Sequence, residues 1–280
     1  MRNLKFTKMQ GAGNDYIYVN GAENIIENPS QLAIKLSNRH FGIGSDGLVI
    51  ILPSETCDFR MQMFNSDGSE SEMCGNATRC IGKYVYDNGL TDKREITLET
   101  KAGVKYITLL DGNAKSRKVT VDMGEPILDP VLIPVLLEGQ PVLNSPLVID
   151  GKTWQISCVS MGNPHAVVFT NGIKDLDLPN LGPKFENNAL FPRRTNTEFI
   201  EVIDRKTLNM RVWERGAGET LACGTGACAA TVAAVLNNYT ERKVTIHLLG
   251  GDLEIEWRES NNHIYMTGDA VTVFEGVVFL

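Results

Sequence analysis

The stretch that decides the fold is Glu70-Ser71-Glu72-Met73-Cys74-Gly75-Asn76, because Glu219-Thr220-Leu221-Ala222-Cys223-Gly224-Thr225 repeats its pattern 149 positions later. Two further landmarks repeat in the same order. Gly13-Asn14-Asp15-Tyr16 is matched by Gly162-Asn163-Pro164-His165 at the same offset of 149, and Val119–Gly124 is matched by Val271–Gly276 at 152. Ordered landmarks at a nearly constant offset indicate an internal duplication. The sequence therefore predicts two similar halves.

Each half contains the same kinds of predicted element. Segments rich in β-branched and aromatic residues are typical of strands; they are Lys5–Val19, Leu48–Leu52, Phe59–Phe64, Glu95–Leu98, Val104–Leu109 and Val119–Asp122, then Ile156–Phe169, Thr197–Val202, Leu208–Trp213, Val244–Leu249, Leu253–Trp257 and Ile264–Phe274. Helices are expected over Gln31–Asn38, Ala77–Tyr86 and Gly226–Leu236. The last is apolar nearly all round, which predicts a buried helix. We expect an α+β protein of two similar, pseudo-two-fold related domains, each a curved, mostly antiparallel sheet wrapped around a central helix.

The halves are separated by a proline-rich segment, Glu125–Pro146, which contains five prolines. Proline fixes φ and removes a backbone donor, which disfavours a helix or a central strand. We expect this segment to be an extended linker.

Composition excludes several classes of protein. The 280 residues include 27 Lys and Arg against 34 Asp and Glu, so the net charge is −7 and no basic stripe is present to bind nucleic acid. The apolar runs are too short to cross a membrane, and the N-terminus lacks the apolar region of a secretion signal. We therefore expect a cytoplasmic protein whose cysteines are reduced. The sequence contains no CxxC pair, the spacing typical of a structural zinc site, so we expect no metal.

Two of the six cysteines have a setting suited to chemistry. Cys74 and Cys223 each precede a predicted helix, where the helix dipole and unpaired N–H groups favour a thiolate and lower the thiol pKa. The glycine that follows each one lets a ligand approach the backbone, and the first N–H groups of the helix can bind a carboxylate. The other four are expected to be structural; these are Cys57, Cys80, Cys158 and Cys228.

Two such motifs facing one cleft would form an acid–base pair. One thiolate would remove a proton from a carbon atom and the opposite thiol would supply one to the other face, which inverts the stereocentre. The two titrations would then be coupled. A nucleophilic protease fits less well, because it needs one cysteine, one base and one orienting group rather than a duplicated cysteine.

The chain resembles the diaminopimelate epimerase family along nearly its whole length. The resemblance is carried by a combination of motifs: Cys74-Gly75-Asn76-Ala77-Thr78-Arg79-Cys80, Ala222-Cys223-Gly224-Thr225-Gly226, Gly162-Asn163-Pro164-His165, Gly11-Ala12-Gly13-Asn14-Asp15, Phe64-Asn65-Ser66-Asp67-Gly68, Arg194-Thr195-Asn196 and Glu214-Arg215-Gly216. Proline racemases share the two-thiol logic and a Cys-Gly-Thr-Gly element, but the first motif here is similar to the epimerase version.

The resemblance implies an epimerase without cofactor that interconverts LL- and meso-2,6-diaminopimelate in lysine and peptidoglycan precursor biosynthesis. It implies that Cys74 and Cys223 are the catalytic acid–base pair and that the protein is a homodimer. It also implies that the last strand returns to the first domain, which gives one domain of residues 1–122 and 270–280 and a second of residues 123–269.

The resemblance further implies a set of substrate-binding residues, which supply the amide, Arg and Glu groups that a substrate with two carboxylates and two ammonium groups needs. These are Asn14, Asn65, Gly75, Asn76, Asn163, Asn196, Glu214, Arg215, Gly224 and Thr225. His165 and Glu214 match residues that modulate the thiols. Many members have Gln where this chain has Gly47, which corresponds to Asn196 in the repeat, so Gly47 is a doubtful site residue without a side-chain contact.

Three alternatives stay open at this point. The first is a racemase or epimerase for proline-like substrates. The second is a thiol redox or metal-binding protein that uses Cys74 and Cys223, against which the lack of a CxxC pair argues. The third is a binding module of the same fold that has lost catalysis, against which the presence of both thiols argues.

Overall fold

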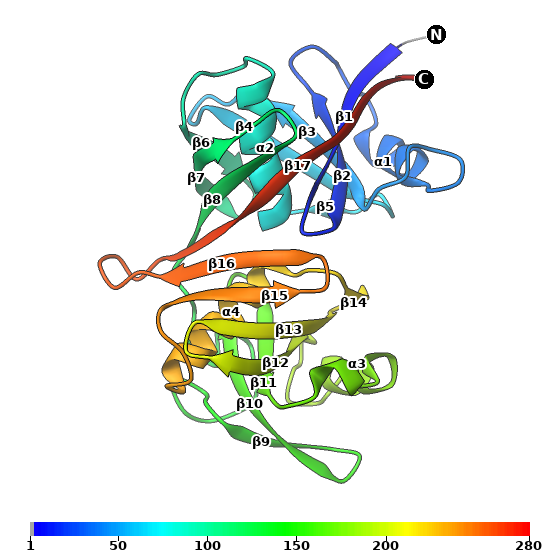
Figure 1. Ribbon diagram of the computed structural model, residues 1–280. Helices are drawn as coiled ribbons and strands as arrows, with labels where there is room; N and C mark the ends of the chain where they lie inside the picture. The colour runs from blue at the N-terminus through cyan, green and yellow to red at the C-terminus, as the bar shows by residue number, and fades with distance from the viewer. Residues whose placement is uncertain (1–2) are drawn as a thin grey trace. The chain divides into compact units, whose positions relative to one another are not determined.

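The computed structural model describes residues 3–280, which divide into two compact units (Figure 1). The first extends to Asp122 and also contains Thr267–Leu280, and the second is Met123–Met266. The chain thus returns to the first unit at Thr267, within one continuous strand, whereas the sequence analysis places this return at residue 270.

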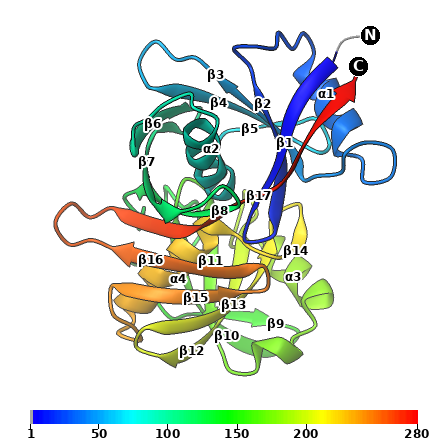
Figure 2. The same cartoon turned by 45° about the horizontal axis from the view of Figure 1, so that its top comes forward.

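The first unit is a sheet wrapped around one helix. Its elements are β1 (Asn3–Gly11), β2 (Asn14–Asn20), α1 (Pro29–Ser37), β3 (Gly47–Leu52), β4 (Phe59–Asn65), β5 (Glu70–Ser71), α2 (Gly75–Asp87), β6 (Glu95–Thr100), β7 (Gly103–Gly112), β8 (Ser116–Gly124) and most of β17 (Ile264–Phe279). The strands pair in the order β1–β2–β3–β4–β6–β7–β8. Strand β17 pairs with both β8 and β1, which closes the sheet into a ring. Figure 2 shows α2 inside this closed ring of strands.

The central position of α2 explains its burial. Residues 75–85 of the helix are all buried, including the charged Arg79 and Lys83. Lys83 is stabilised by ion pairing with Asp87 and by the carbonyl oxygen of Ala114, which lies 2.6 Å from its Nζ. A buried charge needs such partners.

The second unit repeats this arrangement around α4 (Gly224–Leu236). Its other elements are β9 (Ser145–Ile149), β10 (Lys152–Ser160), β11 (Pro164–Phe169), a 3-10 turn at Ile173–Asp175, α3 (Leu178–Glu186), β12 (Asn196–Asp204), β13 (Thr207–Glu214), β14 (Gly218–Thr220), β15 (Lys243–Leu248) and β16 (Gly251–Trp257). The helix consists mainly of small residues, and most of it is buried. The buried helix expected from its apolar composition is confirmed.

Strand registers reveal the duplication directly. Tyr16 pairs with Gly47 between parallel strands β2 and β3, and His165 pairs with Asn196 between β11 and β12. The pairs Met63–Ser71 and Val212–Thr220 are matched in the same way. Each position in the second unit lies 149 residues after its counterpart, so the predicted α+β fold with two similar wrapped sheets is confirmed.

Two of the expected strands are each two strands joined by a tight turn. Residues 5–19 form the hairpin of β1 and β2, which turns at Ala12 and Gly13, both with positive φ (52° and 80°). Residues 156–169 form the hairpin of β10 and β11, which turns at Gly162 with φ 99°. The single-strand predictions were wrong because the apolar pattern runs through short turns that glycine permits.

The structure also contains a helix that the sequence analysis missed. Helix α3 begins with Asp177 as its N-cap, whose side chain accepts a hydrogen bond from the N–H of Asn180. It includes Pro183, and that proline content masked the helical pattern.

The proline-rich segment is more than a linker. Ile133, Val135 and Val142 are buried in the main hydrophobic cluster of the second unit, and the main chain of Ile127 bridges to Ser160. The expectation of an extended linker is therefore corrected: prolines prevent regular structure here, but the apolar side chains between them contribute to the core.

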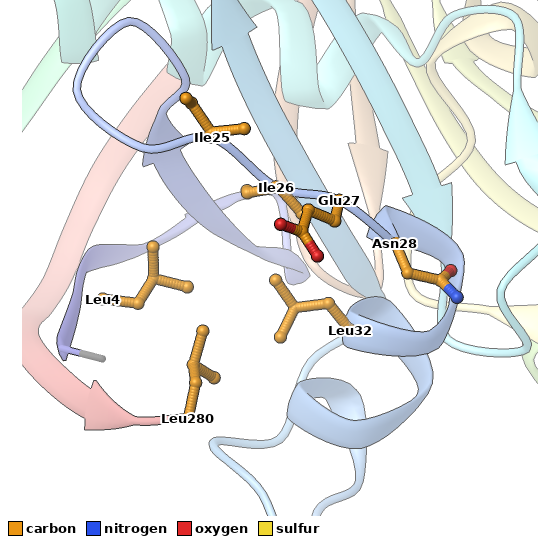
Figure 3. A pocket seen from close by; sticks show the side chains of 7 residues that line it. All are labelled: Leu4, Ile25, Ile26, Glu27, Asn28, Leu32 and Leu280. Atoms are coloured by element: carbon orange, nitrogen blue, oxygen red, sulfur yellow. The ribbon is translucent and has the colours of Figure 1, made fainter. Parts of the chain in front are cut away.

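A mainly apolar pocket of about 330 Å³ lies in the first unit (Figure 3). It is lined by Leu4, Ile25, Ile26, Glu27, Asn28, Leu32 and Leu280. None of the residues implicated by the cysteine motif lines it. Within residues 3–280, no helix has the length and apolar character needed to cross a membrane.

Candidate functional site

Both candidate cysteines occupy the N-cap positions of the central helices. Cys74 precedes α2 and Cys223 precedes α4, each with an extended backbone (φ −136° and −121°). The Cys223 sulfur interacts with the backbone N–H of Gly226 in the first turn of α4. The first N–H groups of each helix have no intrahelical acceptor.

The Cys74 thiol lies against a fixed amide. Its Sγ is 3.3 Å from Oδ1 of Asn14, and that oxygen also lies 3.5 Å from Nδ2 of Asn76. The Asn14 amide is held from behind, because its Nδ2 donates a 2.7 Å hydrogen bond to Asp46. Arg39 pairs with Asp46 at 2.9 Å. The first unit therefore brings together three predicted site residues, Cys74, Asn14 and Asn76.

Two other predicted site residues of this unit, Asn65 and Gly47, pair with one another across β3 and β4. Asn65 donates to Ser69 Oγ at 3.0 Å. A Cβ atom added at Gly47 would lie 2.1 Å from the carbonyl oxygen of Phe64. The main chain of β4 therefore occupies the space that a side chain at position 47 would need.

The second unit places a chain of polar contacts beside Cys223. The Cys223 Sγ lies 3.5 Å from Oγ1 of Thr225, which accepts a 3.3 Å hydrogen bond from Nδ2 of Asn163. The Asn163 Oδ1 is 3.0 Å from Nε2 of His165, and the His165 Nδ1 is 2.7 Å from Oε1 of Glu198. Four of these residues are predicted site residues, and Glu198 is new.

Glu214 and Arg215 lie at the end of β13, in a turn held by other side chains. Asn196 accepts a 2.9 Å hydrogen bond from the main-chain N–H of Arg215 and donates to the carbonyl oxygen of Pro164. The hydrogen bond from the N–H of Arg215 to the Asn196 side chain helps to position Arg215. The exposed guanidinium of Arg215 donates to the carbonyl oxygen of Arg193 at 3.0 Å.

Electrostatics at Cys223 differ from the sequence expectation. Burial raises the pKa of its thiol well above the usual range, and the carboxylates of Glu214 and Glu198 raise it further, although the hydrogen bond with Thr225 opposes them. A helix N-terminus alone favours the thiolate, but here desolvation outweighs it. Burial also raises the pKa of Glu214, against hydrogen bonds with Thr220 and Cys223 that lower it.

The two cysteines consequently have unlike surroundings despite the duplication. The positions of His165, Glu198 and Glu214 in the second unit correspond to Tyr16, Val49 and Asn65 in the first, 149 residues earlier. Three titratable groups near Cys223 are therefore replaced by uncharged counterparts in the Cys74 unit. Elsewhere, burial raises the pKa of Cys80 to about 11 and that of Cys158 to about 12, which keeps both as thiols at neutral pH.

Sequence reasoning missed three supporting carboxylates. Asp46 holds Asn14, and Glu198 holds His165. Glu186 of α3 accepts hydrogen bonds from the N–H of Gly216 and from Nε1 of Trp213. One signal was available for Glu198: it lies two residues after Asn196 within an apolar strand, and alternation places both on one face. Across residues 3–280, no group of three or more His, Cys, Asp or Glu is arranged to hold a metal.

Solved structures define the class to which this fold belongs. A phenazine biosynthesis protein of the PhzF family from Bacillus anthracis superposes with a TM-score of 0.68 at 18% identity, covering 100% of both chains. A hydroxyproline epimerase from Agrobacterium vitis superposes with a TM-score of 0.67 at 13% identity, covering 99% of this chain and 91% of that one. The fold is that of the PhzF proteins and these epimerases.

Sequence comparison then identifies the family. The diaminopimelate epimerase family profile matches residues 6–128 and 157–273. A diaminopimelate epimerase of Acetivibrio thermocellus is 62% identical over 277 residues, and one of Desulfovibrio desulfuricans is 61% identical over 283. Each alignment covers 99% of both chains. The chain belongs to the diaminopimelate epimerase family, as the motifs predicted.

Proposed function

We propose that this protein is an isomerase that interconverts LL- and meso-2,6-diaminopimelate by transfer of two protons at Cα, with Cys74 and Cys223 as the acid–base pair. One observation carries the proposal: each cysteine is the N-cap of a central helix at equivalent positions of a duplicated fold. A thiol at that position lies beside free N–H groups that can bind the carboxylate attached to the reacting carbon.

The thiol pair accounts for both proton transfers. A thiolate removes the proton from Cα, and the electron pair of the broken C–H bond remains on the carbon. The thiol on the other side then gives its proton to the opposite face of that carbon. The configuration is inverted, one sulfur has gained a proton and the other has lost one. Neither an organic cofactor nor a metal is needed in this scheme.

The raised pKa of Cys223 supports a role for this thiol as the proton donor in the free enzyme, because burial and the nearby carboxylates favour its protonated form. A two-base reaction then requires Cys74 to be the thiolate. A turnover leaves the roles reversed, so the free enzyme must return its proton before the next turnover in the same direction.

Substrate binding is assigned by chemical complementarity. The N–H groups of the first helical residues hold the carboxylate beside Cα, while amide, Arg and Glu groups hold the distal carboxylate and the ammonium groups. The first set is Gly75, Asn76, Gly224 and Thr225, and the second is Asn14, Asn65, Asn163, Asn196, Glu214 and Arg215. We assign Gly47 no side-chain contact. His165 and Glu214 modulate the pKa values of the two thiols.

The setting of the reaction follows from its substrate. We propose a role in lysine and peptidoglycan precursor biosynthesis in the cytoplasm, as a homodimer that binds neither nucleic acid nor membrane. Exposed apolar side chains on β17, among them Val273, Phe274, Val277 and Phe279, support association through this part of the first unit.

The substrate is tested by incubating the purified protein separately with LL-diaminopimelate, L-proline and trans-4-hydroxy-L-proline, and by resolving the stereoisomers chromatographically. We expect the diaminopimelate to approach a mixture of LL and meso isomers while both proline substrates stay unchanged. Inversion of proline or hydroxyproline without diaminopimelate turnover would show that the enzyme belongs functionally with its structural neighbours. No inversion of any substrate would favour a binding module or a redox protein.

A further inference from the structure

The carboxylate of Glu186 joins helix α3 to two loops of the second unit. Glu186 is the last residue of the helix, and only 8% of its side chain is exposed. Its Oε1 accepts a 2.9 Å hydrogen bond from the main-chain N–H of Gly216 and pairs with Arg194 at 2.9 Å. Its Oε2 accepts a 2.8 Å hydrogen bond from Nε1 of Trp213. Both carboxylate oxygens are therefore occupied, and two of their three partners flank the proposed substrate-binding pair at the end of β13.

The turn that follows β13 depends on contacts of this kind, because its own main chain is permissive. Gly216 and Gly218 both have positive φ, 79° and 82°, and the side chain of Arg215 is exposed. Glycine at such positions has more conformational freedom than other residues. The carboxylate of Glu186 holds the N–H of Gly216, and the amide of Asn196 holds the N–H of Arg215. These two side chains fix the main chain on both sides of the arginine.

Helix α3 is itself fixed against β13 at two further places. Arg211 of β13 donates a 2.6 Å hydrogen bond to the carbonyl oxygen of Ile173, in the 3-10 turn that precedes the helix. The main chain of Gly182 lies so close to the indole of Trp213 that an added Cβ would be 2.2 Å from the ring. Because the helix is held before its start and along its length, the carboxylate of Glu186 at its end is a fixed point for the turn.

The first unit contains the same elements without the charges. Helix α1 is the counterpart of α3, 149 residues earlier, and its last residue, Ser37, corresponds to Glu186. Ser45 corresponds to Arg194, and the hydroxyl oxygens of the two serines are 3.1 Å apart. The counterpart of the arginine in the turn is Ser66. The unit that carries the arginine is thus the one in which this contact is a pair of opposite charges, and this links the charged pair to the arginine.

We propose that Glu186 is a positioning residue, which anchors the turn after β13 so that Arg215 is presented at a fixed place to the distal carboxylate of the substrate. This inference rests on the proposed function, because it deepens the role of the same binding residue. A guanidinium and a carboxylate interact through directional, often paired hydrogen bonds, so the arginine must hold one orientation. Anchoring the turn in advance avoids the cost of ordering it when the substrate binds.

Steady-state kinetics of Glu186→Gln with LL-diaminopimelate test the proposal. Glutamine has nearly the same volume, but its amide has one acceptor atom, so either Gly216 or Trp213 then faces an N–H donor. The distal carboxylate is remote from the reacting carbon, so its binding supports substrate and transition state alike. We therefore expect KM to rise about tenfold while kcat changes less than about threefold. Glu186→Asp keeps the charge and should raise KM less, and it serves if the Gln variant folds poorly.

Hydrogen–deuterium exchange measures the anchoring of the turn without substrate. In Glu186→Gln we expect the peptide of residues 213–218 to exchange about tenfold faster than in the wild type, because its main chain has lost a hydrogen-bond acceptor. Peptides of the buried helix α4 should exchange as before, since they open only with the whole unit. If the wild-type protein does not turn over diaminopimelate, the proposed function fails, while this experiment still decides whether Glu186 anchors the turn.

Asp58→Asn is the matched control. Its carboxylate also accepts one main-chain and one side-chain hydrogen bond, both from Thr97, and forms an ion pair with Lys93. None of these partners is a proposed site residue. The variant should lose thermal stability to a similar extent, with KM and the exchange of residues 213–218 unchanged.

Four results would overturn the proposal. An unchanged KM in Glu186→Gln would show that the residue is merely structural, and an equal rise in KM in Asp58→Asn would attribute the effect to general destabilisation. A fall in kcat at constant KM would mean that Glu186 acts through Glu214 on the reacting thiol and not through Arg215. Unchanged exchange of residues 213–218 would show that the turn does not depend on the carboxylate.

Discussion

Replacing either Cys74 or Cys223 with alanine is expected to lower kcat for epimerisation by about 1,000-fold, because each thiol performs one of the two proton transfers and general acid–base groups typically contribute factors of this size. Both variants should stay folded. Cysteine is not among the strong N-cap residues, which are Ser, Thr, Asn and Asp, so alanine at either position keeps the start of the helix. Stereoisomer conversion and circular dichroism measure the two effects.

Cys57→Ala is the matched control, because Cys57 is a partly exposed cysteine that lies before β4, outside the motif. It should retain full activity. If Cys74→Ala or Cys223→Ala keeps more than about a tenth of the wild-type kcat, that thiol is not a proton-transfer group in the sense proposed.

A methyl group at Gly226 is expected to have the second largest effect. A Cβ atom there would lie 2.6 Å from Oε1 of Glu198 and 3.2 Å from the Cys223 sulfur. Both groups must move, and the carboxylate has no open space to move into because it is fully buried. We expect Gly226→Ala to lower kcat about 100-fold, since small displacements of reacting groups have effects of this order, and to lower the free energy of unfolding by about 1–3 kcal/mol.

The control for crowding is Gly82→Ala in α2, where an added Cβ would lie 2.7 Å from Cγ2 of Ile107. The crowding is similar, but it affects a side chain remote from any reacting group. Thermal unfolding should therefore show comparable destabilisation with activity retained. Equal losses of activity in the two variants would attribute the effect of Gly226→Ala to general destabilisation.

The duplicated architecture was predictable because landmarks separated by a constant offset are visible in one sequence. Cys74 and Cys223 pointed to the two central helices, and the apolar run after Cys223 indicated burial. Turns were harder: Ala12 and Gly162 interrupt runs whose composition is uniformly typical of strands. Helix α3 was missed because its prolines outweighed the N-cap signal of Asp177.

The protonation behaviour of the site was harder to predict from the sequence than the identity of its residues. The position of Cys223 before a helix favoured a low pKa, but its burial and two neighbouring carboxylates reverse that direction. Burial depends on the tertiary structure and leaves no local signature. Alternation with Asn196 was the one sequence signal for Glu198, but its contact with His165 depends on the parallel pairing of β11 with β12. Gly47 lacked an explanation until its contact with the main chain of β4 was visible.

The central claim is that two thiols move protons at opposite faces of one carbon, and label partition in deuterium oxide tests it most directly. LL-diaminopimelate is incubated with the enzyme, and substrate and product are separated and analysed for α-deuterium after a few per cent conversion. The proposed mechanism predicts that the meso product carries one solvent deuterium at the inverted carbon while the recovered LL isomer stays almost unlabelled. Recovered LL isomer labelled as fast as the product would show that a single base removes and returns the proton, and would contradict the two-thiol mechanism.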